Sequence, residues 1–220
     1  MTDQKIALVT GASRGFGAAV AEELARRGYH VVAVARTSGA LEELDDRIQA
    51  AGGHATLAPM DITVDDAMRT LCRGIYDRWG HVDLWVHSAI QTPPFSPAEQ
   101  IDLKFWTKAV AANVEALGVL ANFISPLLRA TPGGGHAVLV DDLAEGPFLG
   151  AYAACKAAQR AIFAAWAAEQ ARLQDVHVHR FVPAPMPTNH RNRLFPGEDI
   201  SGLAQPRDEA ARMVTELGLG

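Results

Sequence analysis

Cysteine and excess positive charge are both scarce in this chain of 220 residues. Its two cysteines, Cys72 and Cys155, lie far apart and form no CxxC pair, a usage typical of a reducing compartment. The 20 Lys and Arg residues are outnumbered by 25 Asp and Glu, which leaves a formal net charge of −5. No stretch gathers the basic residues, so nucleic acid and anionic membrane surfaces are not expected as general partners.

Long apolar runs and a leader segment are missing as well. The chain begins Met1-Thr2-Asp3-Gln4-Lys5 and goes directly into a strand-like apolar segment, without the apolar core of a signal peptide. Its longest apolar runs are too short to span a bilayer. Together with the cysteine usage, this pattern predicts a soluble, cytoplasmic protein with no membrane partner.

Short runs rich in Val, Ile, Leu and Ala alternate with stretches of helical period. The strand-like runs cover 6–10, 31–35, 55–58, 84–87, 137–140 and 176–182. Runs that are apolar on both faces are typical of parallel strands covered by helices on each side. We therefore predict an α/β fold, a single doubly wound Rossmann-type domain over residues 1–220 with a mostly parallel sheet. A long helix over 102–130 should carry Phe105, Val110, Val114, Leu117 and Leu120 on its apolar side.

A glycine-rich turn, with Gly11, Gly15 and Gly17, follows the first predicted strand. A turn that passes close to a pyrophosphate needs glycine, because a side chain would block the approach. The helix that follows offers free N–H groups and the positive end of its dipole. Any tight strand-to-helix connection can also use glycine, but the position after the first strand favours a dinucleotide site. The residues predicted to form it here are Gly11, Ser13, Arg14, Gly15, Phe16 and Gly17.

The end of the second predicted strand bears on the choice of cofactor. NAD enzymes usually place a carboxylate there for the adenosine ribose, whereas this chain reads Val34-Ala35-Arg36-Thr37. Arg36, helped by Arg14, would neutralise a 2′-phosphate instead. We therefore predict that NADP(H) is favoured over NAD(H). The alternative is that Arg36 is a solvated residue at a strand end.

Tyr152 and Lys156 form a YxxxK pair just after the fifth predicted strand. Four residues apart on a helix, the two side chains share a face. A phenol with an ordinary pKa near 10 is a poor base at neutral pH, but a nearby ammonium favours its ionised form and brings proton transfer into range. Such a pair is often no more than two exposed side chains of an amphipathic helix, without a chemical role. Its place at the carboxyl end of a nucleotide-binding sheet favours a catalytic role.

Five motifs follow one another at the intervals of a known family. They are TGASRGFG at 10–17, Asp61-Ile62, Asn113 in the long helix, YAACK at 152–156 and Pro183-Ala184-Pro185-Met186-Pro187-Thr188. In this order they resemble the short-chain dehydrogenase/reductase family over nearly the whole chain. The resemblance implies that Tyr152 donates the proton in reduction, that Lys156 lowers its pKa and binds the nicotinamide ribose, and that Asn113 steadies a proton-relay water.

The same resemblance extends the predicted cofactor site and adds a lid. Asp61 and Ile62 would line the adenine pocket, and Thr188 would approach the nicotinamide amide or a diphosphate oxygen. Residues 186–205 would form a substrate lid. The remaining residues that it assigns to the cofactor are Ser88, Ala89 and Pro183.

The chain departs from the family where relatives carry a serine that binds the substrate carbonyl. It reads Val140-Asp141-Asp142 at the end of the fifth predicted strand, and no Ser or Thr occurs from 132 to 187. An ionised aspartate cannot donate a hydrogen bond and would raise the pKa of Tyr152, whereas a protonated one donates like a hydroxyl. Our hypothesis is that Asp142 or Asp141 occupies the serine position. A solvated acidic pair is the alternative.

Two further departures lie after the fourth predicted strand and at the end of the chain. Relatives show Asn-Asn-Ala-Gly where this chain has His87-Ser88-Ala89-Ile90; the isoleucine narrows the room near the cofactor, and His87 is interpreted as a structural residue. Relatives also continue past a helix like 206–217 into a seventh strand. We expect a homodimer through the helices near 102–130 and 150–172, with a higher oligomer as the alternative.

Two functions are consistent with these patterns. The first is an NADP(H)-dependent oxidoreductase that moves hydride between the nicotinamide and a small-molecule carbonyl or secondary alcohol. The second is a non-catalytic dinucleotide-binding protein that serves sensing or assembly. The missing serine favours the second, and the intact Tyr152, Lys156 and Asn113 favour the first. A metal is not expected, because His177 and His179 share a strand face without a third ligand at a characteristic spacing.

Overall fold

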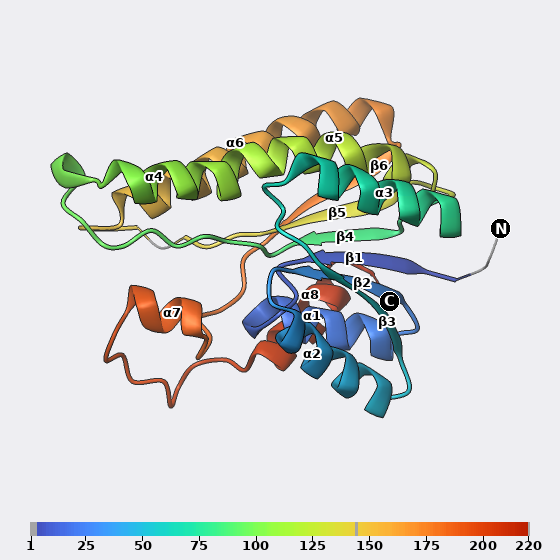
Figure 1. Cartoon of the computed structure of the whole chain (residues 1–220), viewed down its shortest axis with the longest axis horizontal. Coiled ribbons are helices and arrows are strands. Elements are labelled where there is room, and N and C mark those ends of the chain that lie inside the picture. Colours follow the sequence, from blue (N-terminus) through green and yellow to red (C-terminus); the bar gives the residue numbers. More distant parts are fainter. Residues whose placement is uncertain (1–3, 144, 220) are drawn as a thin grey trace.

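A six-stranded parallel sheet forms the centre of the molecule (Figure 1). The computed structural model describes residues 4–143 and 145–219. The strands lie in the order β3-β2-β1-β4-β5-β6, which confirms the predicted doubly wound α/β fold. They are β1 (Ile6–Thr10), β2 (His30–Ala35), β3 (His54–Pro59), β4 (Leu84–His87), β5 (Gly135–Val140) and β6 (Val176–Phe181). Each begins and ends within two residues of a predicted run.

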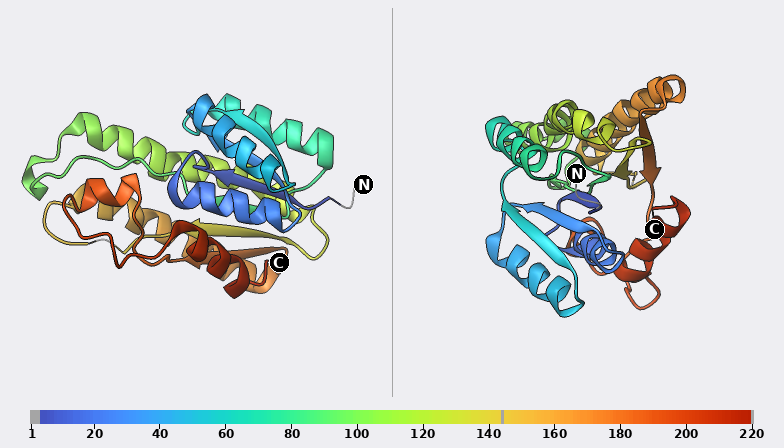
Figure 2. Two further views of the ribbon diagram at one scale, coloured as in Figure 1. Left: turned by 90° about the horizontal axis from the view of Figure 1, so that it is seen from below. Right: turned by 90° about the vertical axis from the view of Figure 1, so that its right-hand side faces the viewer.

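Helices cover both faces of this sheet (Figures 1 and 2). One face carries α1 (Gly15–Arg26), α2 (Ser38–Ala50) and α8 (Pro206–Glu216), and the other carries α3 (Asp65–Trp79), α5 (Ala116–Arg129) and α6 (Gly150–Leu173). In β1, Ala7 and Val9 pack into one apolar cluster while Ile6 and Leu8 pack into the other. This two-sided burial explains why the strand runs are apolar throughout rather than alternating.

The long helix predicted over 102–130 consists of three pieces. They are α4 (Leu103–Val110), a π-helical turn η2 (Ala111–Glu115) and α5. The carboxylate of Asp102 begins the helix by accepting a hydrogen bond from the backbone N–H of Lys104 at 2.8 Å. The predicted apolar side is buried only in its second half, at Leu117 and Leu120, because α4 extends beyond the edge of the sheet (Figure 1). Phe105 is 41% exposed.

The same helix corrects the expectation that nothing in the chain is long and apolar enough for a bilayer. Judged by length and composition alone, Leu103–Arg129 is such a helix. Counting uninterrupted apolar runs missed it, because isolated polar residues break the run without lowering its mean hydropathy much. Core helices of soluble domains meet the same criterion, and here Leu117, Leu120 and Leu128 pack in the apolar core.

The direction in which successive strands are added to the sheet reverses between β1 and β4. The connections that leave β1 and β4 therefore lead to opposite sides of this point. Ligands of doubly wound sheets bind there, at the carboxyl ends of the strands. The loop after β6 crosses this edge and leads to the short helix α7 (Asn189–Leu194). Helix α8 holds the loop in place, because Arg212 Nη2 donates to the Val182 carbonyl at 3.0 Å and Glu209 Oε2 accepts from the Ala184 N–H at 2.7 Å.

Candidate active site

The glycine turn brings β1, β4 and the first turn of α1 close together. A Cβ on Gly11, whose φ is +87°, would lie 2.6 Å from the backbone nitrogen of Ala89, and one on Gly17 would lie 2.2 Å from the Gly11 carbonyl oxygen. Only glycine permits this packing. A Cβ on Gly15 would meet nothing nearer than the Thr188 side chain at 3.4 Å, so two residues predicted to bind the cofactor adjoin one another.

The amino end of α1 has the properties of an anion site. Its first turn carries no acidic residue, and Arg14 at the N-cap makes no side-chain cap hydrogen bond. The free N–H groups and the helix dipole therefore favour a negatively charged group at this point. The Phe16 side chain is buried, and its ring stacks on Phe181 in the core with centroids 5.8 Å apart. The backbone thus fits a pyrophosphate.

The side chains predicted to hold the adenosine end are mostly exposed. Arg36 and Arg14 are both exposed, and neither pairs with a carboxylate among the residues that the structure describes. Asp61 caps its own turn, with Oδ1 accepting from the Thr63 N–H at 3.0 Å and from the Thr63 hydroxyl at 2.9 Å. Ile62 is buried beside it. The two arginines therefore remain available to an anionic ligand.

Tyr152 lies at the centre of a polar cluster at the carboxyl edge of the sheet. Its hydroxyl, on a side chain only 2% exposed, donates to Asp142 Oδ2 at 2.9 Å and lies 3.0 Å from His190 Nε2. The other ring nitrogen of His190, Nδ1, lies 2.8 Å from the Thr92 hydroxyl. These four residues come from α6, the loop after β5, α7 and the loop after β4.

The two consecutive aspartates point to different neighbours. Asp141 is buried, with carboxylate oxygens 3.5 Å from Arg160 Nη1 and 3.6 Å from Arg180 Nη1. Asp142 instead reaches Tyr152, and its carboxylate lies 3.5 Å from His190 Nε2. Of the two residues considered for the missing serine, the structure therefore brings Asp142 to the tyrosine and uses Asp141 in a buried ion-pair cluster.

The electrostatics around Tyr152 favour the protonated phenol. Burial raises its pKa, and the carboxylates of Asp142 and then Asp141 raise it further. Lys156 is itself buried and donates to the Val140 carbonyl at 2.9 Å, and its desolvation lowers the pKa of its ammonium to about 8. The ammonium was predicted to favour the phenolate, but burial and the aspartates determine the pKa of Tyr152 and favour the phenol.

Asn113 is buried in the π-helical turn and has its side chain fully engaged. Its Oδ1 accepts from the Gln91 N–H at 2.7 Å, and its Nδ2 donates to the Gln91 carbonyl at 2.8 Å. The backbone carbonyl of Asn113 accepts from Gln159 Nε2 at 2.9 Å. Such π-turns are frequent at functional sites. The role of Asn113 toward a relay water stays a prediction.

The remaining histidines have structural surroundings. His87 is fully buried with Nδ1 2.9 Å from the Thr10 hydroxyl, while its Nε2 has no hydrogen-bond partner among the described residues. Burial, with a smaller effect of Lys156, lowers the pKa of its imidazole to about 3, and its structural role stays a prediction. His179 Nε2 lies 3.0 Å from Nδ1 of His136, a neighbour on β5 that the sequence analysis did not consider. Within the described residues, no group of three or more His, Cys, Asp or Glu side chains is suited to a metal ion.

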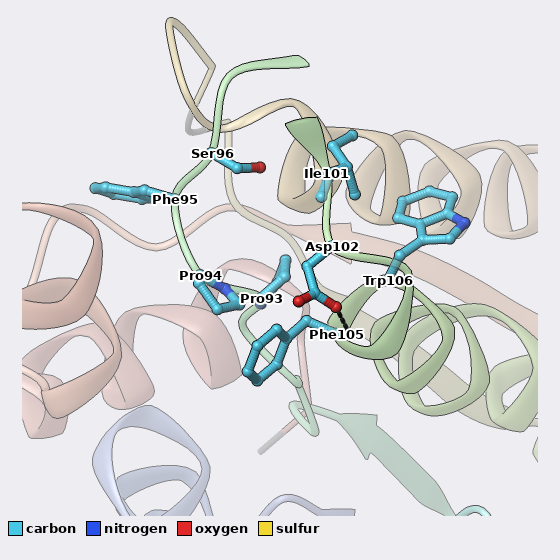
Figure 3. Close-up of a pocket in the computed structure, with 9 residues that line it drawn as sticks. Pro93, Pro94, Phe95, Ser96, Ile101, Asp102, Phe105 and Trp106 are labelled. Atoms are coloured by element: carbon cyan, nitrogen blue, oxygen red, sulfur yellow. Dashed lines mark hydrogen bonds between the residues drawn. The ribbon is translucent and has the colours of Figure 1, made fainter. Parts of the chain in front are cut away.

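A small apolar cavity borders the amino end of α6 (Figure 3). Its volume is about 110 Å³, and Ala151, the residue before Tyr152, forms part of its wall. The loop after β4 and the start of α4 supply the rest, including the Phe105 and Trp106 rings (Figure 3). The full lining is Pro93, Pro94, Phe95, Ser96, Ile101, Asp102, Phe105, Trp106 and Ala151. Apart from Ser96 and Asp102, these side chains suit the apolar part of a ligand.

Comparison with known proteins agrees with this architecture. The short chain dehydrogenase family profile matches residues 5–199. The short-chain dehydrogenase/reductase FrzI of Cladobotryum sp. is 30% identical over 189 residues, 84% of this chain and 72% of that protein. A fatty acyl-CoA reductase of Acinetobacter baylyi is 41% identical over 85 residues, 39% of this chain but only 29% of that longer protein.

A solved structure of a metagenomic short-chain oxidoreductase in complex with NADP is similar throughout. It is 27% identical, aligns with a TM-score of 0.82, and the alignment covers 98% of this chain and 90% of that one. The predicted family is thereby confirmed: the chain belongs to the short chain dehydrogenase family.

Proposed function

We propose that this protein is an NADP(H)-dependent oxidoreductase that transfers hydride between the nicotinamide and a carbonyl or secondary alcohol. The observation that carries the proposal is the cluster around Tyr152, which lies at the carboxyl edge of the sheet beside an anion-binding helix terminus. NADPH, when bound, supplies the hydride. The chain contributes the proton, the orientation of the substrate and the exclusion of water.

Tyr152 is the proton donor in this proposal. Its raised pKa keeps the phenol protonated at neutral pH, which is the form needed to protonate the oxygen of a carbonyl as it is reduced. In the resting arrangement the hydroxyl donates to Asp142, so it has to rotate about the C–O bond toward the substrate. Asp142 thus holds the hydroxyl where relatives use a serine to hold the substrate.

Arg36 and Arg14 support the choice of NADP(H). Both guanidinium groups are exposed beside the predicted adenosine end and have no carboxylate partner in the described part of the chain. An arginine binds a phosphate through charge-assisted, often bidentate, hydrogen bonds. The 2′-phosphate is the group that distinguishes NADP(H) from NAD(H), and Arg36 is the residue that we assign to it.

Lys156 and Asn113 complete the proposed site, with Lys156 at the nicotinamide ribose. The ammonium now donates to the Val140 carbonyl, within the chain segment that leads to Asp142. We propose a small apolar carbonyl or alcohol as the substrate, because the cavity beside Ala151 is lined mainly by apolar side chains. A cytoplasmic location and a homodimer through the helices near 102–130 and 150–172 belong to the same proposal.

Fluorescence titration with NADPH and NADH tests the cofactor assignment. NADPH should bind more tightly to the native chain, and Arg36→Ser should weaken NADPH binding by about 10-fold or more, since a charge-assisted hydrogen bond contributes about 1.5–3 kcal/mol. Binding of NADH should change little. The matched control is Arg47→Ser, at an exposed arginine on α2 that pairs with Glu22. Equal binding of the two nucleotides would refute the role of Arg36.

A screen of carbonyl compounds with NADPH, followed by absorbance, tests the reaction. Activated carbonyls such as α-diketones and o-quinones are the first probes, because they demand least from the substrate pocket. Tyr152→Phe should abolish turnover and leave NADPH binding intact. The alternative function is a non-catalytic dinucleotide-binding protein, which the lack of a serine directly after β5 favours. Binding without turnover, unaffected by Tyr152→Phe, would support that alternative.

A further inference from the structure

We propose that His190 is a catalytic residue that exchanges a proton with Tyr152 during the reaction. It returns the proton that the phenol gives up in carbonyl reduction and takes it up in alcohol oxidation. This inference rests on the proposed function and adds a group that neither the motifs nor the comparisons assign. Its basis is the contact between His190 Nε2 and the Tyr152 hydroxyl at 3.0 Å.

The imidazole is fixed at both nitrogens. Nε2 lies 3.0 Å from the phenol oxygen and 3.5 Å from Asp142 Oδ2, and Nδ1 lies 2.8 Å from the Thr92 hydroxyl. The ring also packs against Tyr152, with centroids 5.4 Å apart. Because the phenol already donates its single proton to Asp142, its oxygen accepts from Nε2–H. Thr92 holds the ring in the orientation that presents this proton.

Burial makes such a partner necessary. Tyr152 is 2% exposed, and Lys156 and Asn113 are buried as well. The Lys156 ammonium donates to Val140, the Asn113 carbonyl accepts from Gln159, and neither side chain is exposed enough to exchange a proton directly with solvent. The His190 side chain touches the phenol and is 28% exposed. It therefore connects the buried hydroxyl with solvent.

Asp142 also touches the phenol and is 35% exposed, but it is a poorer proton carrier. Near neutral pH an ordinary carboxylate is almost wholly ionised, so it carries no proton to return to the phenolate. An imidazole gains and loses protons near neutral pH, and general acid–base catalysis favours groups of that kind. The charged group that contacts His190 is Asp142, on the loop after β5. Arg191, the next residue of α7, is paired with Glu198, which raises the pKa of its guanidinium, and Asp142 adds a smaller effect.

The proton balance of the step is simple. As hydride forms a C–H bond at the carbonyl carbon, the Tyr152 O–H bond breaks and its proton forms the new O–H bond of the alcohol. The phenolate left behind takes the Nε2 proton of the His190 imidazolium, which becomes neutral, and solvent reprotonates the ring. Alcohol oxidation runs the same steps in reverse.

Nitrogen NMR of the histidine rings tests the contact without any turnover. The chain has eight histidines, and the spectrum of His190→Gln assigns the resonances of His190. Tyr152→Phe should shift the His190 Nε2 resonance, and Thr92→Val should shift Nδ1. Tyr76→Phe, at a tyrosine that is 58% exposed, is the matched control and should shift neither. An Nε2 resonance that Tyr152→Phe leaves unchanged would overturn the inference.

Single-turnover reduction of an α-diketone or o-quinone with NADPH tests the chemistry. His190→Gln keeps an N–H donor for the phenol oxygen but exchanges no proton, and should slow the step roughly 10²-fold or more, in the range of general acid–base catalysis. Free imidazole should partly restore His190→Ala. The control is His177→Gln, at an exposed histidine on β6.

The outcomes separate this inference from the proposed function. A His190→Gln rate equal to the native rate would overturn the proton-exchange role. So would a His190→Ala variant that imidazole does not restore, because a contact that only positions the phenol is not replaced by a free base. A native chain that binds NADPH and reduces no probe would count against the proposed function instead. In that case the Nε2 shift on Tyr152→Phe still decides whether His190 shares the tyrosine proton.

Discussion

The buried ammonium of Lys156 should make the chain less stable at neutral pH than at alkaline pH. The side chain is 5% exposed, and desolvation lowers its pKa from 10.5 to about 8. Between these two values the unfolded chain binds more protons than the folded chain, so the free energy of unfolding rises with pH across this window. At 1.36 kcal/mol per pKa unit, the cost of holding the charge in the folded chain is about 3 kcal/mol near pH 7.

Lys156→Met removes that cost together with the hydrogen bond to the Val140 carbonyl, which contributes about 1 kcal/mol. The variant should therefore be more stable than the native chain by about 2 kcal/mol at pH 7, and this gain should fall to about zero by pH 10. The measurement is urea unfolding of both proteins at several pH values. Taking the difference between them cancels other titrations, such as that of the Cys72 thiol, whose pKa burial raises to about 11.

Lys104→Met, at an exposed lysine on α4, is the control and should show no comparable gain. The reasoning would be refuted by a stability gain in Lys156→Met that stays constant from pH 7 to pH 10. A constant gain would mean that the ammonium is not desolvated and that only packing distinguishes the two side chains.

Two further predictions concern the turn and the tyrosine. Gly11→Ala should lower the free energy of unfolding by about 3 kcal/mol, because its Cβ would lie 2.6 Å from Ala89 N at a φ of +87°. The control is Gly28→Ala, which has open space around it at a φ of +86° and should lower the free energy of unfolding by about 1 kcal/mol. Equal losses of the two variants in urea unfolding would contradict the steric argument. Asp142→Ser removes a carboxylate 2.9 Å from the Tyr152 oxygen. At an effective dielectric constant near 40, which allows for the partial exposure of Asp142, its repulsion of the phenolate is about 3 kcal/mol, so its removal should lower the pKa of Tyr152 by about two. The pH profile of alcohol oxidation should move to lower pH accordingly, and superimposable profiles would rule out this electrostatic effect.

The sheet was predictable because its strands are buried on both faces. The β1 and β4 runs were predicted to the residue, since each passes directly from polar flanks into the core. The glycine turn was predictable for a related reason, because a Cβ at Gly11 or Gly17 would clash with neighbouring backbone atoms. In both cases packing dictates the residue type, so the pattern remains visible in one sequence.

The surroundings of Tyr152 were only partly predictable. The sequence showed two aspartates and no serine directly after β5, but which of the two turns toward the phenol depends on Arg160 and Arg180, which bind Asp141 from other elements. His190 was missed altogether. It meets Tyr152 across 38 positions of the chain, and although it lies within the predicted lid over 186–205, no pattern singled it out. Contacts between loops leave no periodic trace in a sequence.

The π-helical turn η2 changes the direction in which the side chains of one long helix point, so that α4 faces the cavity and α5 faces the core. An α-helix advances about 100° per residue, so the extra residue of a π-turn rotates everything before it relative to everything after it. The aromatic rings of α4 thereby line the cavity while the leucines of α5 fill the core. Deleting one residue between 111 and 115 should therefore turn Phe105 and Trp106 away from the cavity wall, and it should also disturb the buried contacts of Asn113 with Gln91 and Gln159.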